Sequence, residues 1–246
     1  MSADPAPVAG ILLAAGTSSR MGTNKMLLEI DGESLLRRAA RRGLEAGLDP
    51  LFVVLGHEAE RARREIADLP CRPVFNEHYE LGISSSLRAG VAALPPECGA
   101  AIVLLADMPH VTPEMLAALV SHYRKTGARL VASQYGGVFA PPVLYDASLF
   151  PELAVVSDAR CAQQVVKRHL DEAVVLAWPE DRLEDLDRPE DVARLRSGLP
   201  RQPSPPAPLP KGEGGTAKTS PLVSPLPLGE GPGVRAAEPT PWAGTD

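Results

Sequence analysis

Short, wholly apolar runs alternate along the chain with longer segments in which apolar residues recur every three or four positions. The runs at residues 8–13, 51–55 and 100–105 are rich in Val, Ile, Leu and Ala, as strands buried on both faces are. Residues 35–46 and 115–123 show helical spacing instead. Strands that alternate with helices predict an α/β fold, a Rossmann-like three-layer αβα domain around a mainly parallel sheet.

Weaker signals of the same kind predict the remaining elements. Residues 72–75, 130–133 and 174–176 are expected to be strands, and residues 58–68 and 84–94 to be helices.

The helix predicted over residues 35–46 has identifiable ends. Ser34 is a suitable N-cap, and Gly47 is a suitable C-terminal stop. Its second face carries four basic residues and is predicted to be a solvated surface. These residues are Arg37, Arg38, Arg41 and Arg42.

The first predicted strand continues into the stretch ILLAAGTSSRMGTNK, residues 11–25. Its turn contains only small residues, so the backbone can approach a ligand closely, and Gly16 can take a positive φ. Hydroxyl residues follow the turn, and then two cations, Arg20 and Lys25. Amide donors followed by fixed positive charge suit a polyphosphate. The alternative is structural, since many α/β proteins have an apolar strand that ends in a small-residue turn.

Asp107 stands just beyond the apolar run at residues 100–105. A packing role does not explain it, because a lone buried carboxylate is costly. Helix capping is an alternative, although Thr112 and Pro113 already supply the start signal of the next helix. Mg²⁺ prefers one or two carboxylates together with phosphate oxygens, so Asp107 is a candidate metal ligand.

A second polar segment, residues 75–94, reads FNEHYELGISSSLRAGVAAL. Ser84, Ser85 and Ser86 open the predicted helix. Free amides and hydroxyls at a helix N-terminus suit an anionic or polar ligand. Ordinary N-capping by serine is the alternative.

Composition narrows the class of partner. The chain has 246 residues and a net charge of −6, with no basic stripe, which argues against a nucleic-acid partner. Its three cysteines are far apart and lack zinc-site spacing, which is typical of reduced thiols in the cytoplasm. No stretch has the features of a secretory signal or the ~18 apolar residues of a membrane helix. We therefore expect a cytoplasmic protein with no membrane partner.

The composition changes towards the end of the chain. It becomes rich in Pro and Gly and contains an imperfect repeat, PLPKGEG at 208–214 and PLPLGEG at 225–231. Such a sequence cannot bury a core. We expect a flexible N-terminus at residues 1–7, one folded domain at residues 8–196, and a disordered tail at residues 197–246.

Residues 13–25 have the form LAAGxSxRMGxxK. This string resembles the signature of nucleoside-triphosphate transferases of the molybdenum-cofactor type, and most closely that of the molybdenum cofactor cytidylyltransferases. Two further segments support the resemblance. Residues 76–90 are similar to NPxWxxGMxxSLRAG, and residues 105–116 are similar to LxDxPxVxxxxL. The resemblance extends to DLDRPED at residues 185–191, and it implies that the folded domain is a nucleotidyltransferase domain.

The resemblance also implies roles for individual residues. Lys25 would stabilise the α-phosphate and the transition-state charge, Arg20 would hold the β- and γ-phosphates, and Asp107 would hold Mg²⁺, which makes these three the catalytic residues. The implied nucleotide-binding residues are Leu13, Ala14, Ala15, Gly16, Ser18, Arg20, Lys25, Asn76, Gly82, Ser85 and Ser86.

The reaction implied by the resemblance is transfer of CMP from CTP to a phosphorylated acceptor, the molybdenum cofactor, with release of pyrophosphate. A molybdoenzyme or its chaperone is a further implied partner. One alternative is a guanylyl- or sugar-phosphate nucleotidyltransferase. A second alternative is a nucleotide-binding module without turnover.

The second alternative arises from a departure at residues 157–160. Relatives often carry GDxGAR there, whereas this chain keeps Asp158 but has Ser157 and Arg160 at the two glycine positions. We expect Asp158 and Asp187 on the acceptor side of the site. For Asp187, capping of the helix that begins near Pro189 is an equally good explanation.

Overall fold

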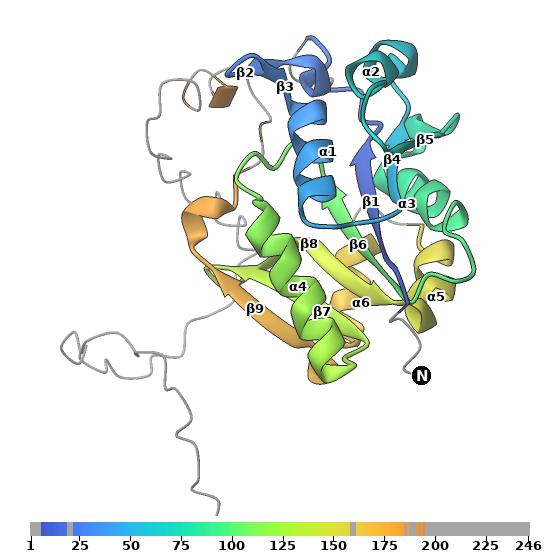
Figure 1. Cartoon of the computed structure of the whole chain (residues 1–246), viewed down its shortest axis with the longest axis vertical. Helices are drawn as coiled ribbons and strands as arrows, with labels where there is room; N and C mark the ends of the chain where they lie inside the picture. The colour runs from blue at the N-terminus through green and yellow to red at the C-terminus, as the bar shows by residue number, and fades with distance from the viewer. Residues whose placement is uncertain are drawn as a thin grey trace, which may run out of the picture. The chain divides into compact units, whose positions relative to one another are not determined.

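The apolar runs form the strands of one seven-stranded sheet in the computed structural model (Figure 1). These strands are β1 (Val8–Ala14), β4 (Leu51–Leu55), β5 (Arg72–Phe75), β6 (Ala100–Leu105), β7 (Leu130–Tyr135), β8 (Val138–Asp146) and β9 (Val174–Trp178). Their order across the sheet is β5-β4-β1-β6-β8-β7-β9. A two-stranded ribbon of β2 (Glu29–Ile30) and β3 (Glu33–Ser34) lies apart from the sheet.

The structure describes residues 6–18, 22–157, 161–184, 186, 191–192 and 194, with the backbone alone at 161–162. These belong to one compact unit within Met1–Pro203. Most of the predicted N-terminal segment, and all of the predicted tail at 197–246, lie outside the described residues. The limits that we expect for the folded domain therefore remain predictions.

The centre of the sheet is parallel, as predicted. β1 pairs in parallel with both β4 and β6, so Ile11 lies between Phe52 and Val103. The carboxyl ends of these three strands therefore meet at one edge of the sheet, where ligands bind in open α/β folds.

The strand β8 is antiparallel to both β6 and β7 and was not predicted. Two consecutive prolines in its sequence argue against a strand, because proline cannot donate to the ladder. The hairpin turn that precedes β8 consists of Gly136 and Gly137, with φ of 53° and 90°. Adjacent glycines are a recognised hairpin signal. That signal outweighs the prolines here.

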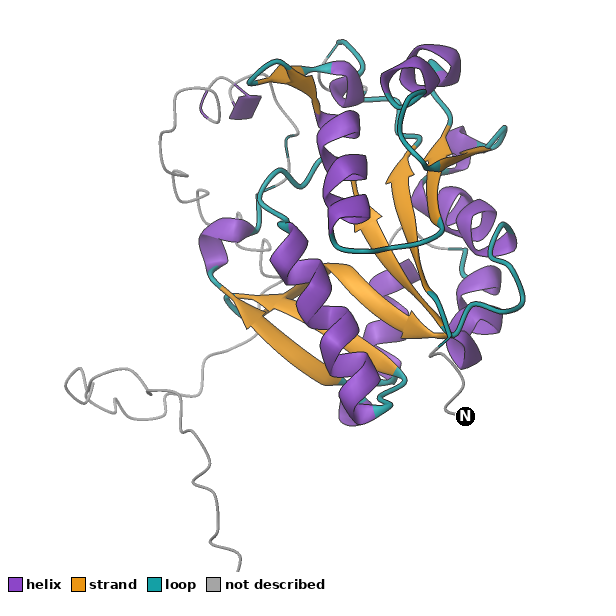
Figure 2. Cartoon of the chain, in the orientation of Figure 1, coloured by secondary structure: helices purple, strands orange, loops and turns teal. Residues whose placement is uncertain are grey.

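Six α-helices cover the two faces of the sheet in the described part of the chain (Figure 2). They are α1 (Leu35–Glu45), α2 (Ala59–Glu65), α3 (Ile83–Ala92), α4 (Pro113–Thr126), α5 (Phe150–Val155) and α6 (Cys161–Arg168). α1, α2 and α4 pack on one face, and α3, α5 and α6 pack on the other. The predicted three-layer αβα architecture is confirmed.

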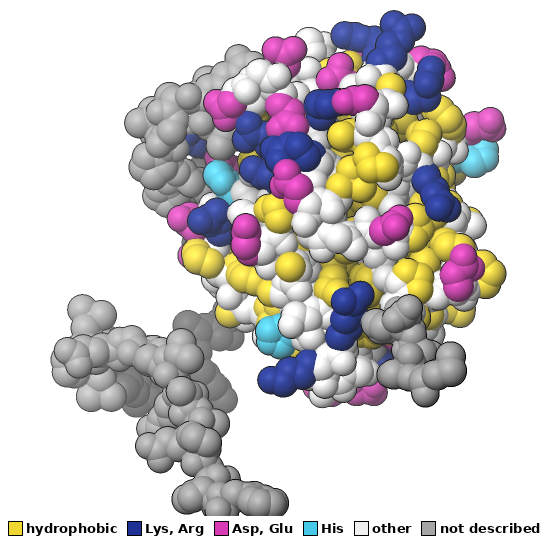
Figure 3. Space-filling view, viewed as in Figure 1, with side chains coloured by type: hydrophobic (Ala, Val, Ile, Leu, Met, Phe, Trp, Pro, Cys, Tyr) yellow, Lys and Arg dark blue, Asp and Glu magenta, His cyan; other side chains and the backbone are white. Residues whose placement is uncertain are grey.

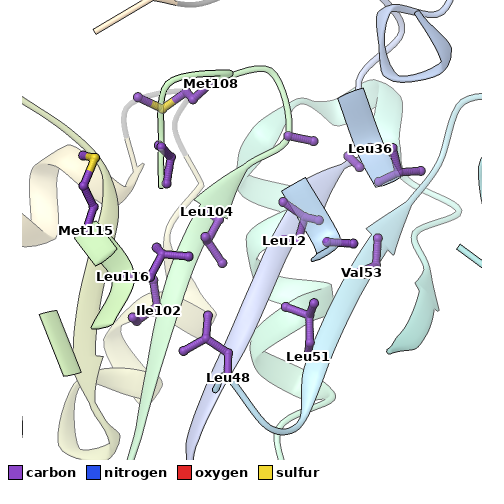
Figure 4. Packing of buried hydrophobic residues seen from close by; sticks show 14 of the residues in the cluster. Leu12, Leu36, Leu48, Leu51, Val53, Ile102, Leu104, Met108, Met115 and Leu116 are labelled. Atoms are coloured by element: carbon purple, nitrogen blue, oxygen red, sulfur yellow. The ribbon is translucent and has the colours of Figure 1, made fainter. Parts of the chain in front are cut away.

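Alternation along the strands divides the core between these two faces. Leu12 of β1 faces α1 and α4, whereas Ile11 and Leu13 face α3. Figure 4 shows part of the first layer, in which strand side chains meet those of α1, α4 and the loop before α4. The residues labelled there are Leu12, Leu36, Leu48, Leu51, Val53, Ile102, Leu104, Met108, Met115 and Leu116.

Local signals set several element ends. The Ser34 hydroxyl accepts a hydrogen bond from the Arg37 amide at 3.2 Å, so it caps α1 as predicted. Residues 25–27 form a short 3₁₀ helix, η1 (Lys25–Leu27), which the sequence pattern did not predict. The Asn24 side chain causes this turn by accepting from the Met26 amide.

No helix in the part of the chain that the structure describes is long and apolar enough to cross a membrane.

The close packing of α3 on the sheet leads to a stability prediction. A methyl group at Gly90 would lie 2.4 Å from Ile11 Cγ2. Gly90→Ala should therefore lower the free energy of unfolding by about 1–3 kcal/mol through overpacking. Urea denaturation measures this change.

Gly43→Ala is the matched control, because Gly43 also lies within a helix. Its added methyl group would lie 3.3 Å from the end of the Leu51 side chain. The helix propensity gained, about 1 kcal/mol, opposes this mild contact, so the change should be small. Equal effects of the two substitutions would contradict the packing described for α3.

Candidate active site

The small-residue turn after β1 forms one wall of a cavity at the carboxyl edge of the sheet. The sequence indicated that Gly16 can take a positive φ in this turn. The residue with a positive φ is Ser18 (52°), two positions later. The Ser18 hydroxyl accepts a hydrogen bond from the Lys25 amide at 3.0 Å. The loop thus closes on itself and sets the start of η1, which carries Lys25.

The cavity has a volume of about 360 Å³. Most of the sequence-predicted nucleotide residues meet there with the predicted metal ligand, Asp107, although they come from three separate parts of the chain. Those that line it are Leu13, Ala14, Ala15, Gly16, Ser18, Lys25, Gly82, Ser86 and Asp107. The fold therefore brings the turn after β1, the start of α3 and the end of β6 around one space.

Lys25 and Asp107 form an ion pair in this cavity. Lys25 Nζ lies 2.5 Å from Asp107 Oδ2, and the two side chains are 12% and 18% exposed. Their meeting follows from the sheet, since β1 and β6 are adjacent and the Ala106 amide continues their ladder by donating to Leu13 O at 3.2 Å. The carboxylate is therefore not the lone buried charge that we inferred from the sequence. Lys25 balances it.

The Asn76 side chain organises the loop before α3. Its amide group donates to the hydroxyls of Ser85 and Ser86 at 2.8 and 3.0 Å, and its Oδ1 accepts from the His78 amide. Ser85 in turn donates to the carbonyls of His78 and Gly82, both at 2.8 Å. The Ser85 hydroxyl is thus occupied within the protein.

Two of the predicted nucleotide residues therefore stand behind the cavity. Neither Asn76 nor Ser85 is part of its lining, and both are buried. Their contacts hold the loop that supplies Gly82 and Ser86. Neither ordinary N-capping nor free hydroxyls describes this arrangement, because α3 begins after Gly82 without a side-chain cap.

Tyr79 forms part of the cavity wall, a position that hydrophobic periodicity alone did not predict. It lies in the 3₁₀ helix η2 (Tyr79–Leu81) and packs over Gly56 at the end of β4. A methyl group on Gly56 would lie 2.5 Å from Tyr79 Cβ, so only glycine allows this approach. The His57 ring lies 6.2 Å from the Tyr79 ring, centroid to centroid.

Arg20, Asp158 and Asp187 lie outside the described residues, as does Arg160. Our expectations for them remain predictions. The neighbour of Asp187 is described, and the Leu186 amide donates to Asp107 O at 3.2 Å. The closing segment of the domain therefore touches the backbone of the candidate metal ligand.

Residues 10–174 match the MobA-like NTP transferase domain. This match covers more than half of the chain and includes both Lys25 and Asp107. The chain belongs to the MobA-like NTP transferase family.

Named relatives of this nucleotidyltransferase have differing descriptions. "Purine catabolism protein PucB" of Bacillus subtilis is 30% identical over 202 residues, covering 77% of this chain and 96% of PucB. A "Probable molybdenum cofactor guanylyltransferase" of Opitutus terrae is 30% identical over 210 residues, covering 80% of this chain and 98% of the relative. The crystal structure of Rv0371c from Mycobacterium tuberculosis H37Rv has a TM-score of 0.70 at 26% identity, covering 78% of this chain and 100% of Rv0371c.

The donor set in the cavity fits Mg²⁺ bound together with a triphosphate. The described residues contain no group of three or more His, Cys, Asp or Glu side chains that could hold a metal ion by themselves. Mg²⁺ does not need such a cage, since it keeps several waters and binds one or two carboxylates plus substrate phosphates. Asp107 meets this requirement because it faces a cavity large enough for phosphate groups.

The predicted list of nucleotide-binding residues omits several residues of the cavity wall. They are Thr17, Met26, Tyr79, Glu80, Ile83 and Leu105. Thr17 and Met26 adjoin residues that were predicted, so their place follows from the loop. The residues around Tyr79 are brought in by a 3₁₀ turn, for which the sequence carries no clear periodic signal.

The role of Asn76 can be tested separately from ligand contact. Asn76→Ala removes the side-chain bonds to the hydroxyls of the buried Ser85 and Ser86 and to the His78 amide, and should lower the free energy of unfolding by about 1–3 kcal/mol. It should also weaken nucleotide binding, because the loop that carries Gly82 loses its brace. Urea denaturation and equilibrium binding measure the two effects. Glu77→Ala, at an exposed neighbouring position, is the control and should change neither.

Proposed function

We propose that this nucleotidyltransferase moves CMP from CTP to a phosphorylated acceptor, the molybdenum cofactor, and releases pyrophosphate in an Mg²⁺-dependent reaction. The observation that carries the proposal is the Lys25–Asp107 pair inside a cavity walled by the amide-rich turn after β1. A cation, a candidate metal ligand and backbone amides in one cavity support the binding of a triphosphate there.

The main catalytic requirement is the neutralisation of charge, because an acceptor phosphate must approach the α-phosphate of the nucleotide. In the proposed mechanism Lys25 turns from Asp107 to the α-phosphate and stabilises the charge that develops there. Amides of the turn from Ala15 to Ser18 hold the outer phosphates, and Arg20 is proposed to assist them. An ionised acceptor phosphate needs no general base near neutral pH.

Asp107 is the proposed ligand of the divalent ion. When bound, Mg²⁺ would supply charge neutralisation and orientation at the phosphate oxygens. The position of Asp107 in the cavity, beside the amide-rich turn, supports this assignment. Asp158 and Asp187 are proposed to contribute on the acceptor side.

The nucleotide base is a choice between CTP and GTP. The relative named as a molybdenum cofactor guanylyltransferase favours GTP. The similarity of residues 76–90 to the cytidylyltransferase form favours CTP. Base choice can depend on one or two contacts, so we keep guanylyl transfer as the second candidate.

Pyrophosphate release tests the proposal directly. The enzyme is incubated with Mg²⁺, the molybdenum cofactor and each of CTP, GTP, UTP and ATP in turn. Release that requires the cofactor and is fastest with CTP is the expected result. Preference for GTP would replace the proposed base, and an absence of release with all four would contradict the proposed acceptor.

Lys25→Met removes the proposed catalytic cation and leaves the Asp107 carboxylate in place. Turnover should fall about 100-fold or more, as when other transition-state charge partners are removed. Binding of Mn²⁺ to the nucleotide-free protein should become tighter, because Lys25 then no longer competes for the Asp107 carboxylate. Electron paramagnetic resonance of free Mn²⁺ measures this affinity. Near-full turnover would contradict the role of Lys25.

Asp107→Asn tests the metal ligand while keeping the size and shape of the side chain. Turnover should collapse, and the dependence on Mg²⁺ should shift to higher concentration, because the amide carries no charge to recruit the ion. Stability should fall modestly, since Lys25 loses its partner in a partly buried site. Unchanged turnover across a Mg²⁺ titration would falsify the assignment.

The double variant Lys25→Met/Asp107→Asn is the control for stability. Removal of both charges relieves the imbalance that each single substitution leaves, so the two losses of stability should not add. Additive losses would show that the ion pair has no energetic coupling.

A further inference from the structure

Arg42 does not lie on the solvated surface that the sequence pattern predicts for the arginines of α1. Its guanidinium is half-buried beneath the loop that follows β6. Nη1 donates to Pro109 O at 2.5 Å and to Val111 O at 2.8 Å. Burial lowers the pKa of the Arg42 guanidinium, although arginine remains charged in proteins.

Its three neighbours on α1 bind acidic partners near the surface instead. Arg37 pairs with Asp68, and Arg38 with Asp31. Arg41 pairs with Glu33 and Glu45. Figure 3 shows Lys and Arg side chains beside Asp and Glu side chains on this face of the molecule.

The loop that Arg42 contacts connects Asp107 to the first turn of α4. It has few bonds of its own, since Pro109 has no amide hydrogen and the Val111 amide donates to Met108 O at a long 3.3 Å. Pro109 and Val111 are buried, so their carbonyls need donors from elsewhere. Arg42 supplies donors to both.

A second contact holds the other end of this loop. The Leu186 amide donates to Asp107 O at 3.2 Å, while His110 Nε2 lies 2.7 Å from Glu184 Oε2. The loop is thus attached to the closing segment on one side and to α1 on the other. The position of the Asp107 backbone depends on both attachments.

We propose that Arg42 is a positioning residue, which fixes the loop after Asp107 and thereby the direction in which the Asp107 carboxylate faces the divalent ion. The proposal rests on the metal role of Asp107 that is proposed above. It does not depend on the identity of the base or of the acceptor.

The chemistry of arginine suits this task. One Nη atom carries two hydrogens, and both are used on carbonyls two residues apart. The planar guanidinium loses little freedom for each bond that it forms. Lysine also carries several donors but is shorter, so Arg42→Lys should retain part of the effect, whereas Arg42→Met should retain only the apolar stem.

The test measures metal binding rather than turnover alone. Mn²⁺ binding is followed by electron paramagnetic resonance in the presence of α,β-methylene-CTP. If the parent protein binds only the guanine nucleotide, α,β-methylene-GTP is used instead. Arg42→Met should weaken Mn²⁺ binding by about 10–100-fold, as is usual when the support of a metal ligand is removed. Arg42→Lys should show a smaller loss.

Arg41→Met is the matched control. Arg41 is the adjacent residue on the same helix, and its partners Glu33 and Glu45 lie away from the cavity. Its substitution should leave Mn²⁺ binding unchanged. Nucleotide binding measured in EDTA should also be similar in all variants, because Arg42 does not line the cavity.

The outcomes separate this proposal from the proposed function. If the parent protein binds Mn²⁺ with a nucleotide analogue but Arg42→Met binds it equally well, the positioning role is overturned and the metal role of Asp107 stands. If the parent protein binds no Mn²⁺ with either analogue, both are overturned. If Arg42→Met does not fold, Arg42→Gln, which keeps donors on a shorter side chain, replaces it with the same expected loss.

Discussion

The candidate site depends on one ion pair at the carboxyl edge of the sheet. Lys25 and Asp107 are far apart in sequence, yet the β1–β6 pairing and the turn that follows β1 place their charged groups in contact. A partly buried cation and anion stabilise each other, and removal of either one leaves a charge whose desolvation is not compensated. The proposed chemistry uses this pairing. An incoming triphosphate would replace Asp107 as the partner of Lys25, and the metal ion would replace Lys25 as the partner of Asp107. The same charges thus serve the empty and the occupied site.

Most of the fold was predictable because the apolar runs of the central strands are unambiguous. β4, β5 and β6 have the bounds that the sequence pattern predicts, and β1 extends one residue further. β8 was missed because its two prolines are typical of loops, and only the hairpin with β7 makes a strand possible. The 3₁₀ turn at residues 25–27 was not predicted, because a local side-chain bond, which no periodicity reveals, sets its conformation.

The candidate site was predictable where its residues belong to a short sequence motif. The turn after β1, Lys25 and Asp107 were found in this way, and they line one cavity. Asn76 and Ser85 were read as ligand contacts, but they bond to each other and support the wall from behind. Arg42 was read as a surface charge, because helical spacing shows which face a residue occupies and not what crosses over that face. Such support depends on tertiary contacts, which one sequence does not display.

The bond between Leu186 and Asp107 has a consequence for the order in which the protein matures. The turn after β1 is synthesised first, while the segment that closes over Asp107 is synthesised about 160 residues after Lys25. Contacts between such distant segments form late, since loop closure must precede them. A nascent chain that has completed the family-matched region at residue 174 still lacks this closure. The backbone of Asp107 therefore gains this attachment only after residue 186 has been synthesised, when every residue that lines the cavity is already present.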